Sequence, residues 1–172
     1  MLDPGFHPRI TRRRVPAFRG RLSDGQNSIF SQLPSYRYRE LSRSIYSKTG
    51  LGIDLLANGV NANNGTKNVV RANSGMDHPV FASAVLADTT LTVTGYVGSA
   101  ANQSTFASAR VEIFKSDNDA TGYGEGQTYL GFLTSEANGN FSGSVTLSSS
   151  LTPGDKITGT ANDGSNNTDE SS

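Results

Sequence analysis

The chain has 172 residues, of which 34% are hydrophobic and 17% are charged, with a formal net charge of zero and no cysteine. Without cysteine it can form no disulfide, thiolate metal site or cysteine nucleophile. Straight-chain helix formers are scarce, which disfavours a helical bundle, whereas the many Thr, Ser, Asn and Gly residues favour an all-β domain with many turns. No apolar run approaches the ~18 residues of a membrane helix.

The first 26 residues predict a basic, disordered arm, because Pro4, Pro8 and Pro16 stand among arginines without periodicity. Residues 1–50 carry ten basic groups and three acids, a net charge of +7, and the remaining residues carry five and twelve, a net charge of −7. Nucleic-acid binding through the arm is therefore one candidate function. The stretch MLDPGFHPRITRRRVPAF lacks the apolar centre of a signal peptide.

Residues 27–56 predict two short strands or the remnant of a preceding β-helix. Ser-Ile-aromatic-Ser occurs twice, in NSIFSQ from residue 27 and in RSIYSK from residue 43, and Ile and Tyr favour extended chain. Residues 57–78 are dense in Asn and Gly and predict a long irregular connector.

Residues 79–172 predict an antiparallel β-sandwich, because six short alternating segments are joined by Gly- and Asn-rich turns with no helical window between them. Within TTLTVTGYV, Leu91, Val93 and Val97 share one face, and in ARVEIFKS the apolar Val111 and Ile113 lie opposite Arg110 and Glu112. Asn138-Gly139 predicts a hairpin with a type I′ turn. The closing NTDESS is the candidate for a seventh strand.

The stretch SDNDATGYGEG, from residue 116, has partial features of two ligand loops. As a calcium loop it lacks the glutamate expected at the twelfth position, where Thr128 stands, and no helices flank it. As a dinucleotide loop it lacks the third glycine, where Gln127 stands, and no βαβ unit is present. We expect a solvated turn, with a weak Ca²⁺ site as the alternative, formed by Asp117, Asp119 and Glu125.

Three runs together resemble the Ig-like β-sandwich module of large bacterial secreted and surface proteins, a module that often follows a right-handed parallel β-helix. They are GLGIDLLANGV, then VEIFKSDNDATGYGEGQTYLGFLTSEANGNFSGSVTL, then GDKITGTANDGSNNTDESS, and the part at 122–131 is the most specific. The likeness covers residues 43–172, although the ending lacks the closing Phe of that group. It implies export to the cell surface or beyond, so we expect the chain to be a fragment, a misassigned start or a gene remnant.

The resemblance implies a non-enzymatic structural, spacer or adhesive module without a cofactor. Its partner would be a glycan or a neighbouring surface protein. A carbohydrate-binding accessory module is the alternative, and because the chain has no Trp its aromatic platform would use Tyr96, Tyr123 and Tyr129.

Overall fold

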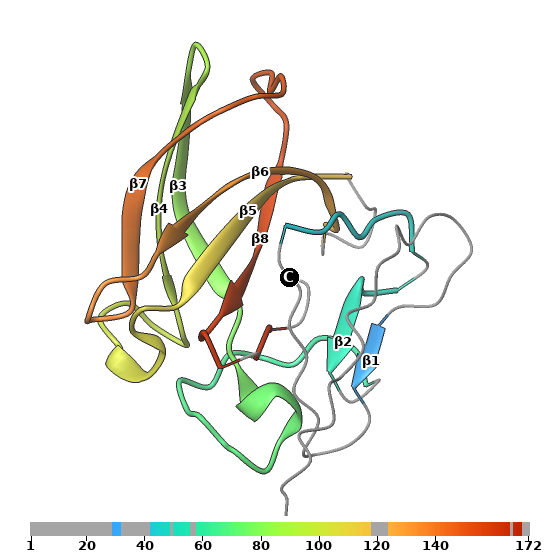
Figure 1. Ribbon diagram of the computed structural model, residues 1–172, viewed down its shortest axis with the longest axis vertical. Coiled ribbons are helices and arrows are strands. Elements are labelled where there is room, and N and C mark those ends of the chain that lie inside the picture. Colours follow the sequence, from blue (N-terminus) through green and yellow to red (C-terminus); the bar gives the residue numbers. More distant parts are fainter. Residues whose placement is uncertain are drawn as a thin grey trace, which may run out of the picture.

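The chain is all-β in a computed structural model that describes residues 29–31, 42–48, 50–55, 58–117, 124–165 and 167–169. The first of two antiparallel sheets has the order β3-β4-β7 and the second has the order β6-β5-β8 (Figure 1). Their strands are β3 (Pro79–Ala87), β4 (Thr90–Val97), β5 (Arg110–Ser116), β6 (Gly126–Thr134), β7 (Asn140–Thr146) and β8 (Ile157–Asn162). The predicted all-β class with two antiparallel sheets is confirmed.

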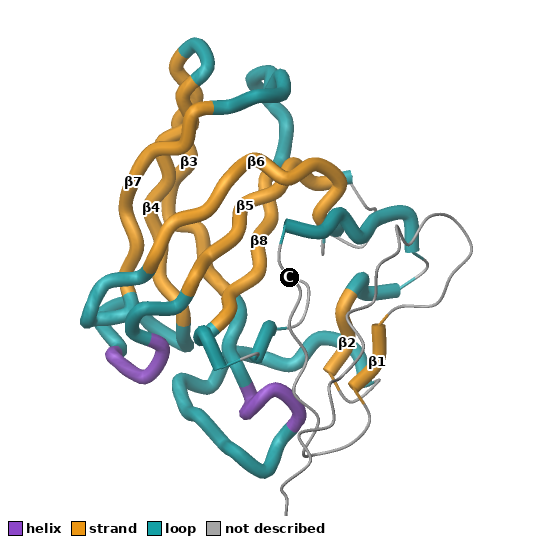
Figure 2. The backbone as a smooth tube through the Cα atoms, in the orientation of Figure 1, coloured by secondary structure: helices purple, strands orange, loops and turns teal. Residues whose placement is uncertain are grey.

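Figure 2 traces the backbone of the two sheets, and alternating residues of their strands contribute to the core. Val93 and Val111 are fully buried, whereas Thr92, next to Val93 on β4, is exposed. Buried and exposed residues alternate along the strand because successive side chains point to opposite faces of the sheet. The buried core residues are Met76, Leu91, Val93, Val97, Phe106, Ala109, Val111, Ile113, Leu130, Phe141, Val145 and Ala161.

The turn at Asn138-Gly139 is present, but the predicted type I′ hairpin is wrong. Gly139 has a φ of +78° and its N–H donates to the Glu136 carbonyl at 3.0 Å, whereas Asn138 is not among the residues with positive φ. The Glu136 N–H donates to Asn140 O at 2.7 Å, which closes a three-residue loop that needs positive φ only at the glycine. Beyond it the chain crosses between sheets, since β6 pairs with β5 and β7 pairs with β4.

The region before the sandwich contains a small parallel pair, β1 (Ile29–Ser31) and β2 (Ile53–Leu55), in which Ile29 is the partner of Ile53. Of the two expected strands, the first overlaps β1. The second is not a strand: residues 42–48, which we call the strap, run as a loop along the outer face of the β6-β5-β8 sheet. The strap contacts β6 through a backbone hydrogen bond from the Ile45 N–H to Gly126 O at 3.0 Å.

The remaining described segments are loops with two 3-10 turns, η1 (Ala72–Gly75) and η2 (Ser104–Phe106). Residues 58–78 contain no strand. Of the segment expected to form a seventh strand, residues 167–169 are described and contribute an isolated bridge from Thr168 to Asn162, and residues 170–172 lie outside the described residues. The basic arm at 1–26 lies outside the described residues, and across the described part of the chain no helix has the length and apolarity to cross a membrane.

Candidate functional site

The candidate calcium residues lie where β5 ends and β6 begins. The structure brings Asp117 and Glu125 together, because the Asp117 N–H donates to Glu125 O and the Glu125 N–H donates to Asp117 Oδ1, both at 3.1 Å. Asp119, like Tyr123, lies outside the described residues. The connecting segment is thus closed at its base by two reciprocal hydrogen bonds.

Both carboxylates accept hydrogen bonds from the strap. The Ser47 N–H donates to Asp117 Oδ2 at 3.1 Å, and the Lys48 N–H donates to Glu125 Oε2 at 2.9 Å. Within the described ranges no three His, Asp or Glu side chains converge in a way that would hold a metal ion. Since Asp119 is part of the proposed set, the calcium site stays a prediction. In the described structure, the carboxylates of Asp117 and Glu125 accept hydrogen bonds from backbone N–H groups.

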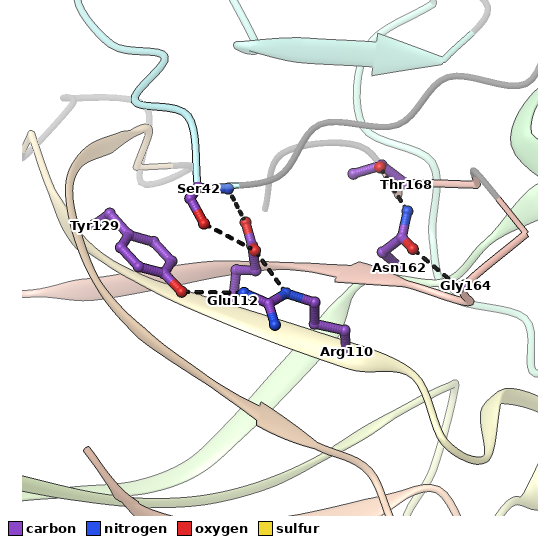
Figure 3. Close-up of polar contacts among 7 residues, drawn as sticks. All are labelled: Ser42, Arg110, Glu112, Tyr129, Asn162, Gly164 and Thr168. Carbon is purple, nitrogen blue, oxygen red and sulfur yellow. Dashed lines mark hydrogen bonds and ion pairs between the residues drawn. The ribbon is translucent and has the colours of Figure 1, made fainter.

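Glu112 is a third carboxylate that binds the strap, and it is only 1% exposed (Figure 3). Its Oε2 accepts the Ser42 N–H at 2.5 Å, and its Oε1 accepts the Arg110 Nε–H at 2.8 Å. Sequence alternation places Glu112 on the face away from the core, which is correct, but it does not reveal that the strap covers this face. The available signal was Phe114, a large apolar residue two positions along on that face.

Arg110 also connects to the aromatic residues of β6. Its guanidinium donates to the Tyr129 hydroxyl at 3.2 Å, as Figure 3 shows, and lies 3.4 Å from the ring centroid of Phe132. The Tyr129 ring packs edge-on against Phe114, with centroids 5.5 Å apart. Tyr129 therefore has both its hydroxyl and one ring edge engaged within the protein.

The predicted aromatic platform is not assembled from the described tyrosines. Tyr96 lies on the outward face of β4, on the side opposite buried Val97, and its neighbours across the sheet are Val80 and Asn140. Tyr129 belongs to the other sheet and faces the strap side. Because the core separates these two outward faces, Tyr96 and Tyr129 cannot stack on one sugar.

Two small pockets flank the strap and the connector. One, of about 20 Å³, lies between the strap and the second sheet and includes Ile45, Glu112 and Phe114. The other, of about 80 Å³, lies beside Asp77 and His78. Neither pocket is lined by Tyr96 or Tyr129.

Asp77 and His78 organise the connector. The Asp77 carboxylate accepts the Gly65 N–H at 2.7 Å and the Asn64 N–H at 3.1 Å. Burial raises the pKa of Asp77 above its ordinary value, and burial lowers the pKa of His78 below 6.5. Asn63 holds the same loop by donating to the carbonyls of His78 and Gly98 and by accepting the His78 N–H.

A second polar cluster follows β8 and is centred on the carboxylate of Asp163. Asp163 Oδ2 accepts from Lys67 Nζ and from Asn167 Nδ2, both at 2.8 Å, and Asp163 Oδ1 accepts the Ser165 N–H at 2.9 Å. Burial alone would raise the pKa of Asp163, but the hydrogen bonds from Lys67, Asn167 and Ser165 outweigh it and hold that pKa below its ordinary value. Sequence reasoning missed this cluster, because nothing in the spacing couples residue 67 to residues 163–167.

Neighbouring bonds fix the segment after β8 to the rest of the fold. Asn73 Nδ2 donates to Thr168 O at 2.6 Å, and Asn162 Nδ2 donates to Thr168 Oγ1 at 3.1 Å (Figure 3). This segment is thereby tied both to the connector and to the end of β8.

Comparison with known proteins adds no further assignment: no protein-family model matches the chain, and no solved structure matches it at a significant level.

Proposed function

We propose that the chain is a non-enzymatic structural or adhesive spacer from an exported bacterial surface protein, with the topology of an Ig-like sandwich. The strand order supports the Ig-like assignment. The first, second and fifth strands of the sandwich form one sheet and the third, fourth and sixth form the other, so that the chain crosses between sheets as it does in Ig-like domains. The parallel pairing of β1 with β2 is the pairing that successive coils of a β-helix make.

The observation that carries the structural role is that three acidic side chains of the sandwich accept hydrogen bonds from the strap. Glu112, Asp117 and Glu125 bind backbone N–H groups of the strap, along its length from Ser42 to Lys48. Charge-assisted hydrogen bonds of this type are about twice as strong as neutral ones. They attach the preceding segment to the sandwich and so fix the direction in which the chain enters it. A spacer needs such a fixed junction.

Mechanical unfolding tests this role. Because the chain has no cysteine, a cysteine added at each end gives two unique attachment points for pulling a single molecule. We expect the strap to stay attached until the sandwich unfolds. The triple variant Glu112→Gln, Asp117→Asn, Glu125→Gln should instead show an early extension at lower force, followed by an unchanged sandwich event.

The matched control is Asp88→Asn, which alters an exposed carboxylate in the β3–β4 turn. It should behave like the unaltered chain. An early release of the strap in the unaltered chain would contradict the structural role.

The carbohydrate-binding alternative has a direct test in a glycan array. The engaged hydroxyl of Tyr129, and its separation from Tyr96, give that alternative no shared platform. Glycan binding that is lost in Tyr129→Ala or Tyr123→Ala would nevertheless replace the structural proposal. Nucleic-acid binding through residues 1–26 stays a prediction, and deleting residues 1–21 should abolish a salt-dependent DNA shift if it is correct.

A further inference from the structure

The edge of the first sheet at β3 is open along its second half. Among the described residues, β3 pairs with β4 on one side and with no strand on the other. At Phe81 the edge is still covered by the second sheet, since a Cβ on Gly159 of β8 would lie 2.8 Å from the Phe81 ring. Residues 82–85 and Ala87 are exposed, and Figure 1 shows that the β3–β4 turn projects at the end of the sandwich away from β1 and β2.

The other side of the sandwich is closed, because β6 and β7 approach each other there. A Cβ on Gly131 would lie 2.9 Å from the Val145 side chain, and a Cβ on Gly143 would lie 2.8 Å from the Leu133 side chain. Glycines at these positions let the edges of the two sheets meet. Strand β3 has no such cover beyond Phe81 in the described part of the chain.

The exposed half of β3 also lacks the features that keep edge strands from pairing, which are charged side chains, prolines and bulges. Pro79 and the bulge between Phe81 and Ser83 both belong to the first half. From Ser83 to Ala87 the register with β4 is regular, and no residue is charged. Alternate N–H and C=O groups of this stretch point away from β4 and can pair with a further strand.

From this geometry we propose that the stretch Ser83–Ala87 binds the same stretch of a second copy of the chain. The two strands run antiparallel about a two-fold axis at Val85. They join the first sheets of the two copies into one sheet of order β7-β4-β3-β3-β4-β7. The proposal goes beyond the structural role above and does not depend on the strap.

The side chains of this stretch are complementary to themselves in that arrangement. Val85, which is 59% exposed on the outer face, meets Val85 of the second copy. Ala84 meets Leu86 of the second copy. Both of these lie on the core side of β3, because their partners on β4 are the buried Val93 and Leu91. Apolar side chains therefore cover apolar side chains on both faces of the joined sheet.

Charge does not oppose the pairing of two copies. Asp88 is the first charged residue after the stretch, and the axis at Val85 places it level with residue 82 of the second copy. The two Asp88 carboxylates are thus six residues apart along the strands, or about 20 Å. This separation exceeds the Debye length of about 8 Å at physiological ionic strength.

Sedimentation of the full chain, from micromolar to millimolar concentration, tests the proposal. We expect the mass to rise with concentration from 18.2 kDa towards twice that value. Val85→Lys, which places two ammonium groups side by side at the axis, should stay at the mass of one chain. The matched control is Val70→Lys, because Val70 is 66% exposed but lies in the connector. It should associate like the unaltered chain.

Disulfide trapping locates the axis. The chain has no cysteine, so Val85→Cys carries a single thiol. Directly opposed residues of antiparallel strands have Cα atoms about 4.5–5.5 Å apart, which is within the range of a disulfide. Under mild oxidation Val85→Cys should form several-fold more covalent dimer than Val70→Cys.

Three results would overturn the proposal. The first is an unaltered chain that keeps the mass of one chain at every concentration. The second is association that persists in Val85→Lys or is lost in Val70→Lys, since the contact then lies elsewhere. The third is equal cross-linking of the two cysteine variants. The first result is measured on the unaltered chain, so a variant that fails to fold does not affect it.

Discussion

At the scale of single residues, the acidic groups on the second sheet act as acceptors for backbone N–H groups. Glu112 shows the energetic consequence most clearly, because it is buried with Arg110 beside it and the Ser42 N–H bound to it. A second ion pair on the same strand, from Lys115 to Asp155, also measures 2.8 Å but is more exposed. Strand β5 therefore carries two ion pairs that differ mainly in burial.

Replacing Glu112 with Ala should destabilise the fold by about 3 kcal/mol, since it leaves the charge of Arg110 and the Ser42 N–H without their acceptor. Replacing Lys115 with Ala should cost less, about 1 kcal/mol, because its partner Asp155 is more accessible to solvent than Glu112, and solvent screens the pair. Urea unfolding of the two variants measures the difference. Equal losses would show that the strap does not shield Glu112.

The lowered pKa of His78 makes stability depend on pH near neutrality. Between the folded pKa and the ordinary value of 6.5, the unfolded chain binds a proton that the folded chain does not bind. Stability should therefore be fully present above pH 6.5 and fall as the pH drops from 6.5 to the folded pKa. Urea midpoints of the unaltered chain and His78→Gln, compared on both sides of pH 6.5, isolate this contribution. A difference that does not change with pH would contradict it.

At the scale of elements, the sequence predicts strands well where one face meets the core and the other meets water. On β4 the alternation of Leu91, Val93 and Val97 with threonines predicts the buried face correctly, because solvent covers the other face. On β5 the same reasoning cannot identify Glu112 as buried, since its cover comes from a strap 70 residues earlier in the chain. The Asn-Gly turn was predictable, but not the crossing between sheets, which depends on long-range pairing.

Gly95 marks a close approach inside the first sheet. A Cβ there would lie 2.2 Å from the Val80 carbonyl oxygen and 2.5 Å from Phe141 Cζ. Gly95→Ala should cost about 2 kcal/mol or more, because the backbone of β3 cannot move aside without breaking its pairing. Gly143→Ala is the control, since its nearest atom is the mobile end of Leu133. Calorimetric unfolding should separate the two variants, and equal costs would contradict the register of β3 on β4.

At the scale of the whole molecule, two apolar clusters are joined by polar contacts. The main core lies between the sheets, and a second cluster of Ile45, Ile53, Leu55 and Ala72 unites the strap, β2 and η1. The sequence predicted the first cluster through its periodicity. It did not predict the second, because these four residues lie in segments with no shared period. The strap contacts both parts, through Ile45 in the second cluster and through its hydrogen bonds to the sandwich.

Amide hydrogen exchange measured by NMR tests these contacts of the strap most directly. The account predicts that the N–H groups of Ser42, Ile45, Ser47 and Lys48 are protected in the unaltered chain, because each donates to an acceptor on β5 or β6 or in the segment that joins them. Glu125→Gln should speed exchange at Lys48 most strongly and leave Val93 unchanged. Exchange of all four strap amides at the rate of an unfolded peptide, in a chain whose core amides stay protected, would contradict it.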